Sequence, residues 1–262
     1  MYNFEFDKPL TVAEAVAALG AEEAQALGGG QTLIPTLKAR LAMPSKLVSL
    51  AGIAEMQGVS VLDDGRLSIG GATTHAAVAA GAGGYPALAA LAGQIGDPAV
   101  RNRGTIGGSL ANNDPSACYP SVALASKAEI VTNTRSIAAD DYFQGMFATA
   151  LEEGEVITEV RFEVPEVANY QKFVQPASRF ALVGVFVAKY ASEVRVAITG
   201  ASNGGVFRWS EAEAALGDDF SASAIDGLVL DGGDMIADLH GTAVYRAHLC
   251  GVMTKRAVAA AA

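Results

Sequence analysis

The chain has 262 residues, 28 of them acidic and 18 basic, so its formal net charge is −10 at pH 7, and 51% of its residues are hydrophobic. This apolar content is enough for a packed core, and the acidic balance argues against a nucleic-acid backbone as the main partner, because phosphates require a basic surface. The two cysteines, Cys118 and Cys250, lie far apart and exclude a disulfide framework or a four-cysteine metal site within this chain.

We expect neither a signal peptide nor a membrane span. The first residues are acidic and lack a long apolar run. The longest stretch without Asp, Glu, Lys or Arg, residues 67–96, consists mostly of Ala and Gly and is too weakly apolar for a membrane span. We therefore expect a cytoplasmic protein without a membrane span.

The first 165 residues predict short helices and strands in irregular order. Thr11-Val-Ala-Glu14 is a capping box, which predicts a helix that ends at Gly20. Asp64-Gly65 predicts a hairpin between strands at 58–62 and 66–70. Further strands are expected at 46–50, 129–133 and 155–164, and helices at 86–94 and 120–126. This order matches neither a doubly wound sheet nor a sandwich and predicts an α+β fold.

The composition changes after Val164-Pro165, where we place a domain boundary near residues 165–170. Runs rich in Val, Phe and Tyr predict strands at 170–174, 182–190 and 194–200, and a further strand at 205–209 is compatible with the pattern. Residues 242–262 predict one helix with Tyr245, Leu249 and Val252 on a single apolar stripe.

Two glycine-rich segments, residues 27–35 and 95–115, carry most of the functional information. Each places consecutive glycines beside hydroxyl and amide side chains, so that backbone N–H groups can converge on an anion. Neither segment has the Gly-x-Gly-x-x-Gly pattern of a Rossmann unit or the Gly-Lys-Ser/Thr of a P-loop. The residues alone leave two alternatives, namely tight turns without a ligand or a site for a phosphate-bearing ligand.

The segment Gly28-Gly-Gly-Gln-Thr-Leu-Ile-Pro35 resembles the first FAD motif of the flavoprotein subunits of molybdenum hydroxylases, and Thr105-Ile-Gly-Gly-Ser-Leu-Ala-Asn112 resembles their second. The chain is most similar to the medium subunits of carbon monoxide dehydrogenase and xanthine dehydrogenase type enzymes. The likeness continues through residues 95–97, 101–103, 176–179, 183–185 and 245–249.

This resemblance implies a two-domain fold. Residues 1–167 would form an FAD-binding domain of the PCMH type, which is vanillyl-alcohol-oxidase-like, with two lobes divided near residues 50–60. Residues 168–262 would form a small C-terminal domain with a three-stranded antiparallel sheet and helices. FAD would lie extended between the two lobes, with its isoalloxazine near the C-terminal domain.

The resemblance also implies the residues that contact FAD, matched position by position. Two loops would surround the diphosphate, and the other positions would contact the rest of the cofactor. These residues are Leu27, Gly28, Gly29, Gly30, Gln31, Thr32, Leu33, Ile34, Ile95, Gly96, Thr105, Gly107, Gly108, Ser109, Asp114, Cys118, Val160 and Lys172. Cys118 stands where the family often has Asp, and a thiol is a poor substitute for a carboxylate acceptor, so that Asp114 or a water would have to compensate.

Three further side chains are open to more than one interpretation. His75 is interpreted as a structural residue near a helix start rather than as a site of covalent FAD attachment. Arg101 and Arg103 leave two alternatives: surface ion pairing, or neutralisation of the flavin phosphates or contact with a partner subunit. No catalytic residue and no metal ligand is assigned to the chain.

By resemblance, the chain is an electron-transfer flavin subunit of an oxidoreductase. In that family a large subunit holds the molybdopterin cofactor and a small subunit holds two [2Fe–2S] clusters, and the complex is a dimer of heterotrimers. FAD passes the electrons to NAD⁺, a quinone, oxygen or another acceptor. Two alternatives are a stand-alone flavin reductase of the same fold, resembling the enolpyruvyl-UDP-sugar reductases, and a structural subunit that has lost FAD.

Overall fold

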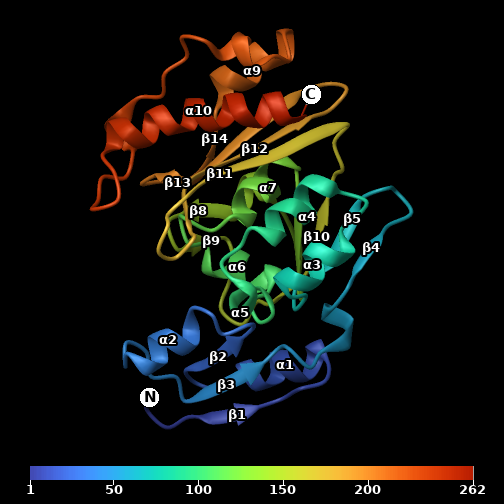
Figure 1. Cartoon of the computed structure of the whole chain (residues 1–262). Helices are drawn as coiled ribbons and strands as arrows, with labels where there is room; N and C mark the ends of the chain where they lie inside the picture. The colour runs from blue at the N-terminus through green and yellow to red at the C-terminus, as the bar shows by residue number, and fades with distance from the viewer. Residues whose placement is uncertain (262) are drawn as a thin grey trace.

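A small sheet of three parallel strands forms the N-terminal end of the molecule, which is the blue part of Figure 1. In this computed structural model, which describes residues 1–261, the central strand β3 (Lys46–Ser49) pairs with β1 (Glu5–Asp7) and β2 (Ala24–Leu27). Helices α1 (Val12–Leu19) and α2 (Leu33–Lys38) complete this part.

The capping box predicted at the start of α1 is present with one difference. The Thr11 hydroxyl accepts from the N–H of Glu14 at 3.2 Å, as expected. The Glu14 carboxylate reaches one residue farther back and accepts from the N–H of Leu10 at 2.8 Å. Both side chains supply acceptors for N–H groups near the helix start, where the first N–H groups have no acceptor within the helix.

A five-stranded antiparallel sheet forms the middle of the molecule, in the order β4-β5-β10-β6-β7. Its strands are β4 (Val59–Val61), β5 (Leu67–Gly70), β6 (Glu129–Thr132), β7 (Ser136–Ala138) and β10 (Ile157–Phe162). Helices fill the connections: α3 (His75–Gly81), α4 (Pro86–Gly93), α5 (Pro98–Arg101), α6 (Ile106–Asn112), α7 (Tyr119–Ala125) and α8 (Ala139–Tyr142). The short pair β8 (Phe143–Gly145) and β9 (Ala148–Thr149) follows, and a single 3₁₀ turn, Ala54–Met56, precedes β4.

The C-terminal sheet is antiparallel and has its strands in sequence order: β11 (Val167–Val174), β12 (Ala181–Lys189), β13 (Val194–Ser202) and β14 (Gly205–Arg208). Both faces are covered, because alternate residues of β12 enter different cores. Val183 and Val185 pack with the core beneath α9 (Ser210–Asp218) and α10 (Ala243–Ala261), whereas Phe186 packs with the core of the middle layer. Figure 1 shows this sheet between α10 and the helices α4 and α7.

Most predicted elements are confirmed, and the α+β fold class is correct. The C-terminal sheet has four strands, so that the short β14 joins the three strands that the family resemblance implied. The apolar stripe predicted for the last helix is correct at Leu249 and Val252, which belong to or pack against the core, but not at Tyr245, which is 41% exposed and packs edge-on against Phe173 while its neighbour Arg246 is buried. None of the helices within residues 1–261 combines the length and the apolar character that crossing a bilayer requires.

Candidate functional site

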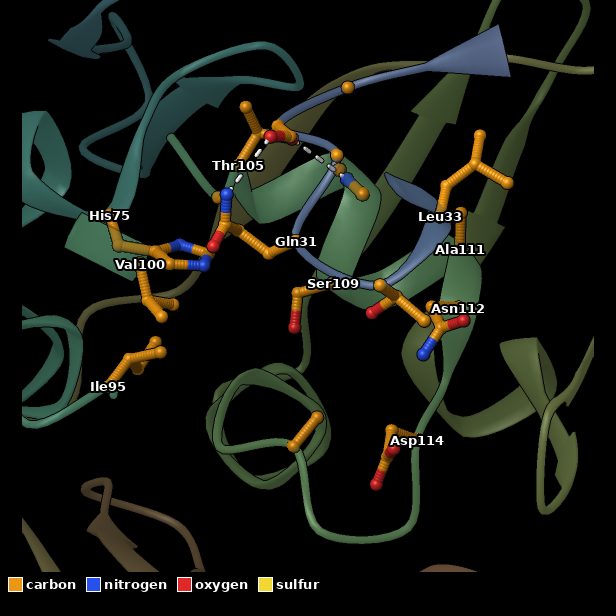
Figure 2. Close-up of a pocket in the computed structure, with 18 of the residues that line it drawn as sticks. Gln31, Leu33, His75, Ile95, Val100, Thr105, Ser109, Ala111, Asn112 and Asp114 are labelled. Atoms are coloured by element: carbon orange, nitrogen blue, oxygen red, sulfur yellow. Dashed lines mark hydrogen bonds between the residues drawn. The ribbon is translucent and has the colours of Figure 1, made fainter. Parts of the chain in front are cut away.

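A cleft of about 630 Å³ passes between all three parts of the molecule. At one end it is lined by Gln25 and Thr36 of the N-terminal part. It continues past both glycine-rich loops and ends at Lys172 and Phe180 of the C-terminal part. Its volume lies in the range of small-molecule and cofactor sites. Figure 2 shows how side chains from these separate elements meet around it.

The first loop, residues 28–33, connects β2 to α2 and presents unpaired backbone donors. Among the hydrogen bonds of residues 1–261, none uses the N–H groups of these six residues, and the first N–H to be paired after them is that of Ile34, with the Gly30 carbonyl at 3.0 Å. Gly30 has φ +74°, a left-handed conformation that glycine adopts without strain. The loop is therefore a set of backbone donors available to an anionic ligand.

The second loop leads into α6 and differs from the first, because the N–H groups of residues 106–109 are already paired. Thr105 caps the helix and accepts the N–H of Gly108 at 3.2 Å on its side chain. The N–H of Ser109 bonds the Thr105 carbonyl, and that of Gly107 bonds the Gly71 carbonyl at 2.9 Å. We expected converging N–H groups in both loops, but only the first loop has them. The second loop contributes the Ser109 hydroxyl and a rigid wall (Figure 2).

Glycines at this wall allow backbone segments to touch each other. A Cβ on Gly29 would lie 2.0 Å from the carbonyl oxygen of Arg103, and a Cβ on Gly107 would lie 2.6 Å from that of Gly71. Both distances are too short for any side chain larger than hydrogen. Gly29 therefore lets the two loops touch, and Gly107 lets the second loop touch the segment after β5, in addition to any contact they make with a ligand.

At the far end of the cleft, Cys118 and Lys172 are in contact. The Lys172 ammonium donates to the Gln94 carbonyl at 3.1 Å and reaches the Cys118 sulfur at 3.5 Å. Asp114 lines the same cleft, and its Oδ1 accepts from the N–H of Ser116 within its own turn at 2.8 Å. A positive charge thus lies in the cleft wall beside a thiol.

Two titratable groups of the lining have perturbed pKa values. The Arg135 guanidinium, 2.9 Å from the carboxylate of Glu155, lowers the pKa of Glu155 to about 2, so that its charge is compensated. Burial, together with the nearby Arg101, lowers the pKa of His75 to about 4, so that His75 is neutral at pH 7. Residues 1–261 contain no group of three or more His, Cys, Asp or Glu side chains that could hold a metal ion.

The two arginines beside the second loop have different roles. Arg101 donates from Nη1 to the carbonyls of Ile95 and Gly96, both at 3.1 Å, and so holds this part of the cleft edge in place. Arg103 lines a second cavity of about 380 Å³ on the other side of the wall made by Gly28 and Gly29. Neither side chain forms an ion pair within the described residues.

The structure brings almost all of the expected contact residues to this cleft. The exceptions are Ile34 and Val160. Ile34 packs in a small apolar cluster with Leu27 and Leu37, and Val160 is completely buried in the core of the middle layer. The lining also contains residues that were not predicted as contacts, among them Gly71, Ala72, His75, Val100, Asn112, Glu155, Val156, Ile157, Arg179 and Phe180. Of these, the sequence analysis had pointed to His75 and Arg179, and to Val100 and Asn112 as members of the second glycine-rich segment.

Comparison with known proteins identifies the ligand for which this cleft is suited. Residues 2–166 match the family described as the FAD binding domain in molybdopterin dehydrogenase. The chain belongs to this family. FAD is therefore its cofactor, and the cleft fits FAD. The N–H donors of residues 28–33 suit a diphosphate. The close approach of Gly29 to Arg103 keeps the first loop at the edge of the cleft, next to the space for the diphosphate.

Full-length relatives of this FAD-binding chain are subunits of oxidoreductases. It is 33% identical over 283 residues to the carbon monoxide dehydrogenase medium chain of Hydrogenophaga pseudoflava, covering 99% of this chain and 97% of the relative. It is 31% identical to the nicotine 6-hydroxylase medium subunit of Paenarthrobacter nicotinovorans, covering 97% and 95%. The structure of reconstituted CO dehydrogenase from Oligotropha carboxidovorans matches with a TM-score of 0.90 at 32% identity, covering 99% and 98%. The chain is thus a flavoprotein component of the same oxidoreductase class.

Proposed function

We propose that this chain transfers electrons through FAD within a molybdenum hydroxylase complex. The observation that carries the proposal is the row of six unpaired N–H donors, residues 28–33, in a cleft that also collects the other expected contact residues. The likeness to medium subunits over the whole chain supports it.

The residues of the chain bind and orient the cofactor. The N–H groups of residues 28–33 would hold the diphosphate, and the Ser109 hydroxyl would add a donor from the opposite loop. Lys172 would place its positive charge against the anionic cofactor at the other end of the cleft. When bound, FAD supplies the ability to accept and release electrons singly or in pairs.

The redox centres on either side of the flavin belong to partner subunits in this proposal. A large subunit would hold the molybdopterin cofactor and oxidise the substrate, and a small subunit would hold two [2Fe–2S] clusters. Only two cysteines are present in the chain, so it cannot supply cluster ligands for either cluster by itself. The assembly would be a dimer of heterotrimers, and FAD would pass the electrons to an external acceptor.

We also propose the division of the chain into an FAD-binding domain, residues 1–167, and a C-terminal domain, residues 168–262. The first element of the four-stranded sheet, β11, begins at Val167, which supports this division. The three-stranded sheet ends with β3 at Ser49, before the middle layer begins, which supports two lobes divided near residues 50–60.

The proposal is tested by purifying the chain alone and together with a large molybdopterin-binding subunit and a small [2Fe–2S] subunit. We expect the chain alone to bind one FAD and to catalyse no substrate-dependent reduction of a dye. The purified complex is expected to reduce its flavin when substrate is added. If the chain alone with FAD oxidises an organic substrate, it is a stand-alone flavoenzyme and the proposal is wrong.

A further inference from the structure

His75 has a buried ring that reaches the FAD cleft from the start of α3. Its backbone N–H bonds the Gly104 carbonyl at 2.9 Å, which fixes the start of the helix beside the second loop. The residue is only 5% exposed, and the surface that remains lines the cleft. In Figure 2 the imidazole extends from α3 toward the side of the cleft from which Gln31 projects.

The ring is held on two sides by neighbouring groups. Tyr119 lies at a ring-centroid distance of 5.3 Å and an angle of 51°. On the other side, a Cβ on Gly104 would lie 2.5 Å from His75 Nε2, so only glycine at position 104 leaves room for the ring. The orientation of the imidazole is therefore fixed by packing.

The two ring nitrogens are in different situations. Nδ1 is completely buried, and no group within residues 1–261 forms a hydrogen bond with it. Nε2 also has no partner among the described hydrogen bonds, but unlike Nδ1 it is not completely buried. The ring is neutral at pH 7 and carries a single proton. A buried N–H without an acceptor is less tolerable than an unpaired lone pair, so the proton belongs on Nε2.

We propose that His75 is a positioning residue for FAD that donates its Nε2–H to an oxygen atom of the bound cofactor. The burial of Nδ1 without an acceptor selects this tautomer before the cofactor arrives, and the packing against Tyr119 and Gly104 fixes the orientation of the ring. A neutral imidazole is sufficient at this position of the cleft. Its N–H can hold an oxygen atom of FAD without a positive charge, as the uncharged N–H groups of the first loop also can. The inference depends on FAD as the ligand of the cleft, but not on the electron-transfer role of the chain.

Two substitutions distinguish this role from a structural one. His75→Phe keeps the ring packing but removes the N–H, and we expect the Kd for FAD to rise about tenfold, as the loss of one hydrogen bond predicts. His75→Gln loses the ring but places an amide N–H near the position of Nε2, and we expect its Kd to remain within about threefold of the original. A residue that acts only by packing against Tyr119 would give the reverse order, and that order would refute the proposal.

The Kd values are measured on the full chain, freed of FAD and titrated with FAD while the flavin fluorescence is followed. Thermal unfolding of each variant identifies one that fails to fold. A second measurement needs no substitution: ¹⁵N NMR of the imidazole nitrogens reports the tautomer. We expect a protonated Nε2 in the FAD-free chain and a change of its resonance when FAD is added. An Nδ1–H tautomer, or an Nε2 resonance that FAD leaves unchanged, would overturn the inference, whatever the outcome for electron transfer.

Discussion

Gly29 and Arg103 are in backbone contact, so close that a Cβ at position 29 would lie 2.0 Å from the Arg103 carbonyl oxygen. The two residues belong to the two glycine-rich loops, which are far apart in the sequence. Their contact forms the wall between the FAD cleft and the second cavity, because Gly29 lines both. The loop that carries the unpaired donors of residues 28–33 thus rests against a neighbouring backbone segment.

We predict that Gly29→Ala abolishes FAD binding. The added methyl group would overlap two groups of the second loop, because the carbonyl oxygen of Arg103 lies 2.0 Å and the Cα of Gly104 lies 2.5 Å from the Cβ position. The loop must move away, and the geometry of its N–H donors is lost. We expect at least a hundredfold increase in the Kd for FAD, measured by flavin fluorescence, and a loss of stability of roughly 1–3 kcal/mol from the forced backbone shift.

The matched control is Gly93→Ala at the end of α4, where a Cβ meets nothing within 4 Å. This substitution is expected to leave the Kd unchanged and to stabilise the chain by about 0.4–1 kcal/mol, because alanine loses less backbone entropy on folding. If Gly29→Ala binds FAD as tightly as this control, the contact with Arg103 does not maintain the site.

We predict that the hydroxyl of Thr105 stabilises the second loop as a helix cap. Its side chain accepts the N–H of Gly108 at 3.2 Å at the start of α6. Thr105→Val removes this acceptor at constant size and is expected to cost about 1 kcal/mol of stability and to weaken FAD binding several-fold. Thr105→Ser retains the hydroxyl and should behave almost like the original chain. Chemical denaturation and FAD titration measure both effects, and equal values for Val and Ser would contradict the capping role.

Local signals in the sequence predicted most of the elements but not their packing. The Thr11 cap and the Asp64-Gly65 turn act within a few residues, so the helix and the hairpin they define were correctly placed. The start of α10, where Arg246 and not Tyr245 is buried, shows the limit of such signals. Arg246 is buried because its guanidinium bonds the carbonyls of Leu182 and Gly200 and the carboxylate of Asp238, all of which come from other elements.

The sequence predicted the site residues that belong to the glycine-rich motifs, but not those whose position depends on how distant segments pack together. Val160 was expected to contact the flavin, but on β10 its side chain faces the core, and Ile157 lines the cleft instead. The sequence could not show that the N–H of Gly107 is paired, because the carbonyl that accepts it belongs to Gly71, outside the second loop. The part played by His75 likewise depends on how α3 packs against residue 104.

We predict that His75 makes the stability of the FAD-free chain dependent on pH between about 4 and 6.5. Burial lowers its pKa to about 4 in the folded chain, whereas the unfolded value is near 6.5. Above pH 6.5 the ring is neutral in both states and its contribution is fully present. As the pH falls, only the unfolded chain binds the proton, so stability decreases by up to about 1.4 kcal/mol per pH unit, roughly 3 kcal/mol in all by pH 4.

The measurement is the free energy of unfolding by denaturant at several pH values for the original chain and for His75→Gln. The carboxylates titrate in both proteins, so the difference between their pH profiles isolates His75. We expect the profile of the variant to be flatter between pH 6.5 and 4. Parallel profiles would show that the pKa of His75 is the same in the folded and unfolded chain, which would contradict a neutral His75 protected by burial.

We predict that Lys172 strengthens FAD binding through its charge. The ammonium is held at the end of the cleft by the Gln94 carbonyl and the Cys118 sulfur, and within residues 1–261 it has no carboxylate partner to neutralise it. Lys172→Met keeps the length of the side chain but removes the charge. We expect the Kd for FAD to rise roughly tenfold, as for the loss of a charge-assisted contact, and to become less sensitive to salt. Cys118→Ser, which leaves the ammonium in place, should change the Kd less than threefold. A Lys172→Met variant with the original Kd and the original salt dependence would show that this charge does not act on the cofactor.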